Sequence, residues 1–262
     1  MSGLLLRLAG PLQSWGERSA FTPVRDTAPF PTRSALIGMF AAAEGIGRSE
    51  AGLDRYQDLQ LTVRVDRPGV RLVDYHTVGG GFPKDRTAAT SGGSNKGAAV
   101  ITRRHYLSDA VFVVAVTGSD QTIERLAAAL TRPHWAPYLG RRSCIPDEPF
   151  LLRRHVDHPE EELRTRVPLS RTAPRTQNGR DEEIGTIAVD FLREQPPPAG
   201  SVEAPVDAID VNDVPVSFAQ HGRTHTGRRL YRTVELLPRS LAGPPTTQMQ
   251  RLIDYAHLEE SA

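Results

Sequence analysis

Strand-like and helix-like patterns of apolar residues alternate along the first half of the chain. Residues 4–8 have apolar side chains on both faces, as in a central strand, and a glycine-bounded loop follows them. A helix is expected to begin at Arg33 after the N-cap Thr32, because the next apolar residues recur at helical spacing. Residues 59–65 alternate strictly between apolar and polar types, which predicts a strand that is buried on one face only.

Two extended segments on either side of a polar stretch predict a long β-hairpin, called the finger below. Its arms are predicted at residues 70–78 and 100–107, and the residues between them are rich in glycine and lack apolar periodicity. Such a stretch is typical of a projecting loop rather than of a linker between folded units. We place the inserted finger at about residues 76–106 and expect residues 79–97 to be mobile in the free protein.

The next elements allow a prediction of fold class. Residues 110–117 are the most strand-like segment, and a second helix is predicted over residues 121–131 after Ser119 or Asp120 as N-cap. With a fourth strand from the following segment, the order of elements is the ferredoxin-like arrangement of RNA-recognition motifs. The sequence therefore predicts an α+β fold with a ferredoxin-like RNA-binding domain at residues 1–150, into which the finger is inserted.

The C-terminal part, residues 151–262, has a weaker pattern and is predicted to be a smaller, mostly β extension. Strands are expected at residues 185–192, 214–218 and 230–237. Residues 195–199 are rich in proline and are predicted to form a connector.

Composition excludes several classes of protein. Apolar residues make up 39% and charged residues 24% of the 262 residues, which is ordinary for a globular protein and argues against wholesale disorder. No apolar run reaches the length needed to cross a bilayer, and the single cysteine, Cys144, excludes an internal disulfide. We therefore expect a protein of the reducing cytoplasm that has no membrane partner.

Charge is distributed unevenly along the chain, although the formal net charge is only +1. Residues 64–106 and 132–180 are rich in basic side chains, whereas the charged residues of 181–215 are acidic except for one arginine. Basic stretches suit phosphate groups, so the first two stretches indicate contact with nucleic acid. The acidic stretch is expected to face solvent or a basic patch on a partner.

Three blocks of sequence carry a family resemblance. The blocks are residues 5–16 (LLRLAGPLQSWG), residues 30–38 (FPTRSALIG) and residues 138–144 (YLGRRSC). In this order and at these separations they resemble the CasD family of the type I-E CRISPR Cascade complex. Weaker matches at residues 74–76, 106–110 and 214–218 accompany them, and the resemblance covers roughly residues 4–234.

The resemblance implies a repeat-associated RNA-binding fold and a non-catalytic role in a CRISPR RNA-guided surveillance complex for antiviral defence. It implies that the chain binds and caps the 5′ handle of CRISPR RNA. The implied neighbours are the CasC backbone subunit and the large CasA subunit, which the chain would bridge. Target DNA would be engaged only indirectly, through the assembly.

The residues predicted to contact RNA lie in the three blocks and along the finger. They are Gln13, Ser14, Trp15, Gly16, Arg33, Ser34, Lys84, Arg86, Lys96, Arg103, Arg104, Tyr106, Tyr138, Arg141 and Arg142. Glycine lets a backbone approach phosphate closely, the start of a helix offers free N–H groups, and arginine offers planar donors to phosphates and base edges. An aromatic ring such as that of Trp15 or Tyr106 can stack on an unpaired base.

Each of these assignments has a structural alternative. The first block can be an ordinary tight connection between a strand and a helix, in which Trp15 fills the core. Arg33 can be a solvated residue of the first helical turn. The two arginines of the third block can form ion pairs with Asp147 or Glu148. The finger can grip a neighbouring subunit instead of RNA.

The alternative function is a metal-independent endoribonuclease that processes CRISPR precursor RNA, as sister subunits in another CRISPR subtype do. Such cleavage needs a base for the 2′-hydroxyl and an acid for the leaving 5′-oxygen. In the candidate pairs Tyr75–His76 and His105–Tyr106, adjacent residues of one strand point to opposite faces. Both lysines of the chain lie in the predicted finger tip. We therefore expect no catalysis, no cofactor and no metal site.

Overall fold

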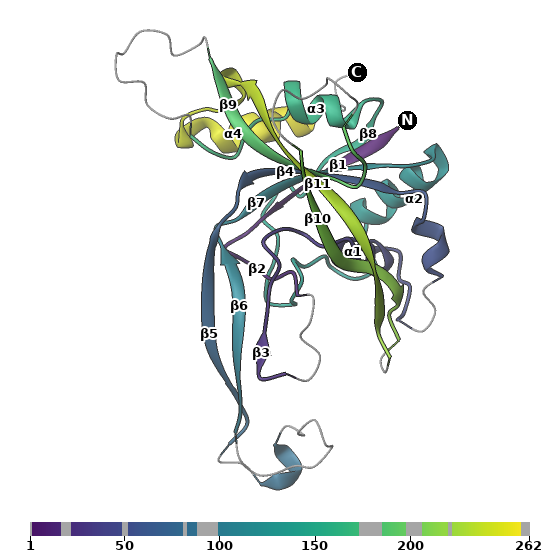
Figure 1. Cartoon of the computed structure of the whole chain (residues 1–262), viewed down its shortest axis with the longest axis vertical. Helices are drawn as coiled ribbons and strands as arrows, with labels where there is room; N and C mark the ends of the chain where they lie inside the picture. The colour runs from purple at the N-terminus through teal and green to yellow at the C-terminus, as the bar shows by residue number, and fades with distance from the viewer. Residues whose placement is uncertain are drawn as a thin grey trace.

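The part of the chain that the computed structural model describes comprises residues 2–16, 22–48, 52–80, 83–87, 99–172, 185–197, 206–219 and 222–257 (Figure 1). Its strands are β1 (Gly3–Ala9), β2 (Leu12–Gln13), β3 (Val24–Arg25), β4 (Gln60–Arg67), β5 (Val70–Val78), β6 (Val100–Ser108), β7 (Val111–Thr117), β8 (Leu151–Val156), β9 (Thr186–Arg193), β10 (Asp207–Ser217) and β11 (Thr224–Pro238). Its α-helices are α1 (Arg33–Ala43), α2 (Asp120–Thr131), α3 (Pro159–Thr165) and α4 (Pro245–Ala256), and its 3-10 helices are η1 (Leu53–Tyr56), η2 (Lys84–Arg86) and η3 (Arg239–Leu241).

Two sheets organise the fold. The larger sheet has seven strands in the order β10-β11-β9-β4-β7-β1-β8, and neighbouring strands in it are antiparallel. The smaller sheet joins β6 to β2, β3 and β5. The fold is therefore mixed α/β with mainly antiparallel sheets, and the predicted mixture of strands and helices is confirmed to this extent.

Strand β1 explains why the first apolar segment of the sequence has no polar face. All seven of its residues are buried. Leu4, Leu6 and Leu8 lie in a core cluster with apolar residues of α1 and α2, whereas Leu5 lies in a second cluster with residues of α3 and α4. Helices therefore cover both faces of the larger sheet, and β1 is a central strand, as its sequence predicts.

Strand β4 differs from the prediction of one buried and one exposed face. Its polar residues Thr62, Arg64 and Asp66 are buried, as are most of its apolar residues. Arg64 Nε lies 2.7 Å from Asp66 Oδ1. The guanidinium also donates hydrogen bonds to three backbone carbonyls in and after α3, those of Leu163, Val167 and Pro168. The polar face is buried because the chain after α3 crosses it and supplies these partners.

The two helices predicted in the first half are confirmed with small differences. Helix α1 begins at Arg33 after the N-cap Thr32, and Gly45 follows its C-cap with a φ of 76°. Glycine adopts this left-handed conformation at little cost and so ends the helix. Helix α2 starts at residue 120 instead of 121, and the Ser119 side chain accepts a hydrogen bond from the N–H of Thr122. Among the described helices none is long and apolar enough to cross a membrane.

The C-terminal part contains the three predicted strands, together with α3 and α4, which its weaker sequence pattern does not predict. Strand β9 pairs with β4, so β9, β11 and β10 extend the larger sheet instead of forming a separate one. Strand β8, at residues 151–156, pairs with β1. The larger sheet therefore runs across the division that the sequence predicts near residue 150.

Acidic residues of the C-terminal part form ion pairs within the chain. Asp213 is only 2% exposed, and its Oδ1 lies 2.6 Å from Arg228 Nε. Glu194 Oε1 lies 2.7 Å from a guanidinium nitrogen of both Arg228 and Arg33. For Asp213 and Glu194 the expectation that the acidic stretch faces solvent or a partner protein is wrong, because their basic partners belong to the same chain. Asp207 and Asp210 of the same stretch are exposed, as expected. Residues 181–184 lie outside the described part.

The finger is a regular hairpin of β5 and β6. Residue pairs run in unbroken antiparallel register from Val70–Ser108 to Val78–Val100, which confirms both predicted arms and places them slightly beyond the limits of 76 and 106. Figure 1 shows the hairpin projecting away from the larger sheet, with the short helix at residues 84–86 near its far end. Most of the stretch predicted to be mobile, including Lys96, lies outside the described residues.

Removal of one partner from the Arg64–Asp66 pair tests how far this pair stabilises the fold. An Asp66→Ala substitution leaves the fully buried guanidinium without its counter-charge. We expect the free energy of unfolding to fall by about 3–5 kcal/mol, the cost typical of a buried pair that loses one partner. Urea unfolding followed by circular dichroism measures this change.

Asp210→Ala is the matched control for this substitution. The Asp210–Arg229 pair is exposed, with 78% and 59% of the two side chains accessible. Exposed pairs contribute about 1 kcal/mol or less, so the control should unfold at nearly the wild-type urea concentration. Equal losses for the two variants would show that the buried pair does not stabilise the protein.

Candidate RNA-binding site

The first and third sequence blocks meet at the base of the finger. The backbone N–H of Ser14 donates a hydrogen bond to the Leu139 carbonyl at 3.0 Å. Gly140 has a φ of 86°, and a Cβ there would lie 1.7 Å from the Ser14 carbonyl oxygen. Only glycine permits this approach, since any side chain would force the two loops apart. The glycine of the third block thus has a structural role that brings Arg141 to the first block.

Two residues of the first block belong to the interior of the protein. Gln13 and Trp15 are fully buried. The Gln13 amide donates to the carbonyls of Leu8 and Ala110, and its Oε1 accepts a hydrogen bond from Trp15 Nε1 at 3.1 Å. The backbone of Trp15 forms a bridge with Ala28. The prediction that Trp15 stacks on a base is corrected, because the indole fills the core and its N–H is already bonded.

The remaining residues of this block lie beside the finger. Ser14 is 2% exposed, and its Oγ donates a hydrogen bond to the His105 carbonyl on β6 at 3.0 Å. Gly16 is exposed and is the last described residue before position 22. The next described strand, β3, runs parallel to β6, and Arg103 N–H donates to the Pro23 carbonyl at 2.8 Å. The chain is therefore attached to β6 both before and after residues 17–21.

Arg33 and Ser34 make none of the contacts described between the first and third blocks. Arg33 Nη1 lies 2.7 Å from Glu194 Oε1, and its other bonds go to backbone carbonyls of the same chain. The backbone N–H of Arg33 donates to Asp213 Oδ2 at 2.6 Å. Ser34 is half-buried, with its Oγ 3.4 Å from Thr32 Oγ1. The predicted phosphate contact of Arg33 is corrected: the anion at the start of α1 is Asp213, and the guanidinium forms an internal ion pair.

Tyr106 and Arg141 stack on each other. Tyr106 is only 6% exposed, and Arg141 Cζ lies 4.5 Å from the centre of its ring. Arg141 Nη2 donates to the Arg25 carbonyl at 3.3 Å, whereas its buried Nη1 has no hydrogen-bond partner among the described residues. The prediction that Tyr106 stacks on a base is corrected, because the ring is buried and the guanidinium covers one of its faces. The stack fixes the plane and position of Arg141.

The other residues of the third block remain partly accessible. Arg142 is exposed and Tyr138 is half-buried. In the described part, no ion pair joins either arginine of the block to Asp147 or Glu148, so that alternative is not observed. Burial raises the pKa of the Cys144 thiol, which keeps it neutral at pH 7. The cysteine therefore adds no negative charge beside the arginines.

The predicted finger residues divide between the two faces of the hairpin. Arg104 lies on the same face as Tyr106, is half-buried and donates from Nε to Thr102 Oγ1 at 3.1 Å. Arg103 lies on the other face and is exposed. Arg86 is exposed in η2; Lys84 lies in the same helix, its side chain outside the described part, as is all of Lys96.

Three arginines from separate segments converge where the two loops meet β6; we call them the arginine junction, namely Arg25, Arg104 and Arg141. Arg25 lies opposite Arg104 in the β3–β6 pairing, and its carbonyl accepts the bond from Arg141. The sequence does not predict Arg25, because a two-residue strand carries no periodicity. Arginine residues brought together on a rigid base suit the phosphates of a nucleic acid.

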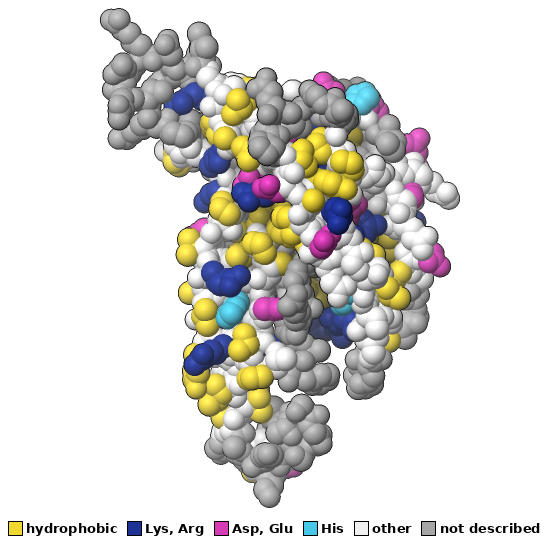
Figure 2. All heavy atoms as spheres, in the orientation of Figure 1, with side chains coloured by type: hydrophobic (Ala, Val, Ile, Leu, Met, Phe, Trp, Pro, Cys, Tyr) yellow, Lys and Arg dark blue, Asp and Glu magenta, His cyan; other side chains and the backbone are white. Residues whose placement is uncertain are grey.

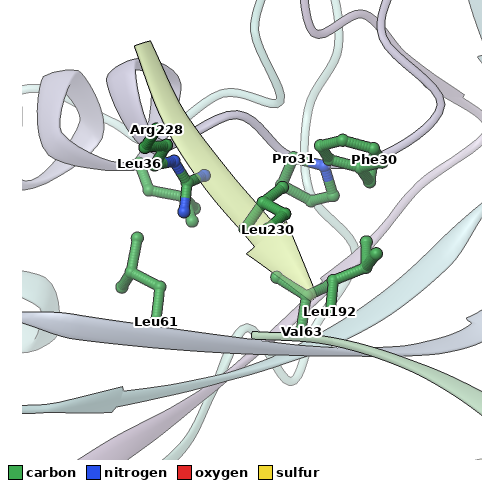
Figure 3. Close-up of a pocket in the computed structure, with 8 residues that line it drawn as sticks. All are labelled: Phe30, Pro31, Leu36, Leu61, Val63, Leu192, Arg228 and Leu230. Atoms are coloured by element: carbon green, nitrogen blue, oxygen red, sulfur yellow. The ribbon is translucent and has the colours of Figure 1, made fainter. Parts of the chain in front are cut away.

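A small pocket beside the second block is not part of this site. Figure 3 shows it between β4, β9, β11 and the start of α1, lined by apolar residues and Arg228. The Arg228 guanidinium is engaged by Asp213 and Glu194, so the pocket offers a ligand no free charge. Within the described residues, no cluster of three or more His, Cys, Asp or Glu side chains is arranged to hold a metal ion.

Comparison with known proteins gives matches over most of the chain. The family model described as CRISPR-associated protein (Cas_Cas5) matches residues 3–231. The CRISPR system Cascade subunit CasD of Escherichia coli (strain K12) is 38% identical over 164 residues, which are 58% of this chain and 70% of that protein.

Two solved structures are similar in fold and sequence. A chain of a structure described as "CRISPR RNA-guided surveillance complex" has a TM-score of 0.83 and 46% identity, and the match covers 97% of this chain and 99% of that one. A chain described as "Crystal structure of Cas protein" has a TM-score of 0.57 and 30% identity, with 93% and 100% covered. Because the family model spans nearly the whole described chain, the protein belongs to the CRISPR-associated Cas5 family.

Proposed function

We propose that the chain is a non-catalytic subunit of a CRISPR RNA-guided surveillance complex, in which it binds and caps the 5′ handle of CRISPR RNA. The observation that carries the proposal is the arginine junction, where two of the three family blocks meet the finger. The similarity of the chain to a Cascade subunit and to a chain of a surveillance complex supports its membership of such an assembly. In the assembly the chain would bridge the CasC backbone subunit and the large CasA subunit, in the cytoplasm.

The arrangement of the first six main elements supports an RNA-binding fold. The order along the chain is β1, α1, β4, β7, α2 and β8, and these four strands lie side by side as β4-β7-β1-β8. We infer that they form the ferredoxin-like core that RNA-recognition motifs use. The finger then is an insertion between the second and third strands of this core, and β9–β11 are an extension at its edge.

The arginine junction suits the backbone of a single-stranded RNA end. Arg141 is held by its stack on Tyr106, so less conformational entropy is lost when it binds a phosphate. Arg142 follows it in the same loop and is exposed. Arg104 on β6 lies opposite Arg25 on β3, and with Arg141 and Arg142 these residues gather basic side chains beside β6. A terminal RNA segment bound there would have its 5′ end covered by protein.

The geometry of the nuclease candidates favours the non-catalytic alternative. Tyr75 and His76 lie on opposite faces of the hairpin, and Tyr106 is buried under Arg141. His76 Nδ1 lies 3.3 Å from Asp74 Oδ2. One observation favours a nuclease: Tyr75 and His105 lie on the same face, at diagonal positions of the β5–β6 ladder.

Nuclease footprinting of the assembly tests the capping role. With all subunits present, the 5′ end of the bound CRISPR RNA should resist a 5′-specific nuclease, because the chain excludes the enzyme from that end. In an assembly that is purified without this chain, the same end should be cut. Equal cleavage in the two samples would contradict the role.

A double substitution at the third block tests the RNA contacts. Arg141→Ala with Arg142→Ala should weaken RNA binding and lower the slope of log affinity against log salt by about one to two units, since each phosphate contact on a single strand contributes roughly 0.7. Fluorescence anisotropy at several salt concentrations measures both quantities.

Arg229→Ala is the matched control for the double substitution. Arg229 is exposed on β11 and pairs with Asp210, away from the arginine junction. It should leave both affinity and slope unchanged. The proposed contacts are wrong if the folded double variant binds RNA with the wild-type affinity and slope.

Incubation with labelled repeat RNA and a chelator separates the two functions. We expect the RNA to stay intact, because Tyr75 and His76 point to opposite faces of the hairpin and Tyr106 is buried under Arg141. If the RNA is cut, and if His105→Ala or Tyr75→Phe abolishes the cut while RNA binding persists, the chain is a nuclease and the non-catalytic proposal fails.

A further inference from the structure

Strand β5 forms an unprotected outer edge of the finger. Its nine residues pair with β6 on one side in unbroken register, and no other described strand pairs with it. Most of its side chains are exposed. An edge strand of this length presents a row of unpaired N–H and C=O groups, which is a template for pairing with another chain.

Two hydrogen bonds on the far side of β6 fix the direction of its backbone groups. Arg103 N–H donates to the Pro23 carbonyl, and the His105 carbonyl accepts from Ser14 Oγ. The backbone groups of these two β6 residues therefore point away from β5. Arg103 and His105 consequently form non-hydrogen-bonded pairs with the β5 residues that lie opposite them.

The same alternation identifies the free groups of β5. Tyr75 lies opposite Arg103, and Val73 lies opposite His105, so the backbone groups of Tyr75 and Val73 point outward from the hairpin. Arg71 and Thr77 occupy equivalent alternate positions. Four residues thus present both an N–H and a C=O along the outer edge, whereas the residues between them are bonded to β6.

The edge that β10 forms in the larger sheet is built differently. Strand β10 contains Pro215, two breaks in register and the exposed carboxylates of Asp207 and Asp210. Proline, bulges and charges are devices that prevent unwanted pairing of edge strands. Strand β5 has no proline and no bulge, and its one acidic residue, Asp74, faces His76. Among the described strands, the β10 edge thus carries devices of this kind, whereas the β5 edge carries neither proline nor bulge.

The side chains around this edge suit a polypeptide better than RNA. Val70, Leu72, Val73 and Ile101 are between 45% and 73% exposed, and Tyr75 is 65% exposed. Figure 2 shows apolar side chains along the finger interleaved with basic ones. RNA is bound by aromatic rings, arginine and N–H donors, whereas an open edge offers a carbonyl for every N–H, and carbonyl oxygens repel phosphate. Exposed aliphatic side chains instead mark a site for protein.

Charge indicates the chemistry of the occupant. Residues 71, 73, 75 and 77 of β5 place their side chains on the same face of the hairpin as residues 101, 103, 105 and 107 of β6. On this face Arg71 and Arg103 are exposed, and none of these eight residues is acidic. A carboxylate on the incoming strand would be stabilised beside Arg71, and apolar residues would be buried beside Val73 and Tyr75.

We propose that the outer edge of β5 binds an extended segment of a neighbouring protein subunit as an added strand, with a carboxylate beside Arg71 and apolar residues beside Val73 and Tyr75. The proposal rests on the proposed function only in that the neighbour is a subunit of the surveillance complex. Main-chain pairing supplies affinity and the alternate side chains supply specificity.

Hydrogen exchange at single-residue resolution tests the pairing directly. In the free chain the amides of Leu72, Asp74 and His76, which are bonded to β6, should exchange slowly, and those of Val73 and Tyr75 should exchange fast. In the full assembly the Val73 and Tyr75 amides should become protected, because they are bonded to the added strand. With CRISPR RNA alone they should stay fast.

Paired substitutions at position 73 separate main-chain from side-chain effects. Val73→Pro removes one outward N–H without removing a bond to β6, because an edge strand tolerates proline where the N–H faces solvent. Val73→Ala keeps the N–H and removes most of the apolar side chain. Val73→Pro should lower the affinity of the chain for the remaining subunits roughly fivefold to tenfold beyond Val73→Ala, the loss of about one backbone hydrogen bond. Slow exchange at Leu72 and Asp74 in the proline variant verifies that the hairpin is intact.

Three results would overturn the proposal. The first is fast exchange of the Val73 and Tyr75 amides in the assembly, and the second is protection of these amides by RNA alone. The third is protection in the isolated chain that rises with its concentration, which would make the occupant a second copy. Footprinting of the RNA 5′ end on the same samples keeps the proposals distinct. An unprotected 5′ end with protected β5 amides refutes the capping role and supports the added strand. A protected 5′ end with unprotected β5 amides supports the capping role and refutes the added strand.

Discussion

The packing of the two halves of the chain against each other depends on the buried ion pair of Arg64 and Asp66. The guanidinium lies in the middle of the larger sheet, where an unpaired charge costs several kcal/mol, and Asp66 neutralises it. Its other donors bind carbonyls in and after α3, and the N–H of Ser170 binds Asp66. Because this network is complete only when the chain after α3 lies on β4, it also brings the second core cluster onto that face.

The same network marks the limit of prediction from sequence. Strands β1 and β7, helices α1 and α2 and the arms of the finger follow from local periodicity, because neighbouring residues decide which face is buried. The polar side of β4 follows instead from a carbonyl at Leu163, 99 residues after Arg64. Alternation of apolar and polar residues therefore predicted the strand correctly and its exposed face wrongly. Helix α3 was missed because seven residues are too few for an apolar stripe.

The candidate site divides along similar lines. Family resemblance singled out loops that do meet in space, yet it did not distinguish residues that hold the loops from residues that face outward. Gln13 and Arg33 are used internally, since they bind groups on distant segments, and Trp15 is buried with its indole N–H bonded to Gln13. Arg25 entered the site from a strand of two residues, for which no pattern exists. Burial of a loop residue depends on what packs against the loop, and sequence alone does not supply that.

The chain is attached at Trp15 and again at Pro23, which allows the length of chain between these two points to vary. Trp15 is held by its bridge to Ala28, and the Pro23 carbonyl is held by the Arg103 N–H. When the ends of a loop are fixed, doubling its length costs only about 0.6 kcal/mol of closure entropy. We therefore expect insertions after Gly16 to leave the core and the Gly140 contact in place. Related chains can therefore differ in length at this point without refolding the protein that carries the arginine junction.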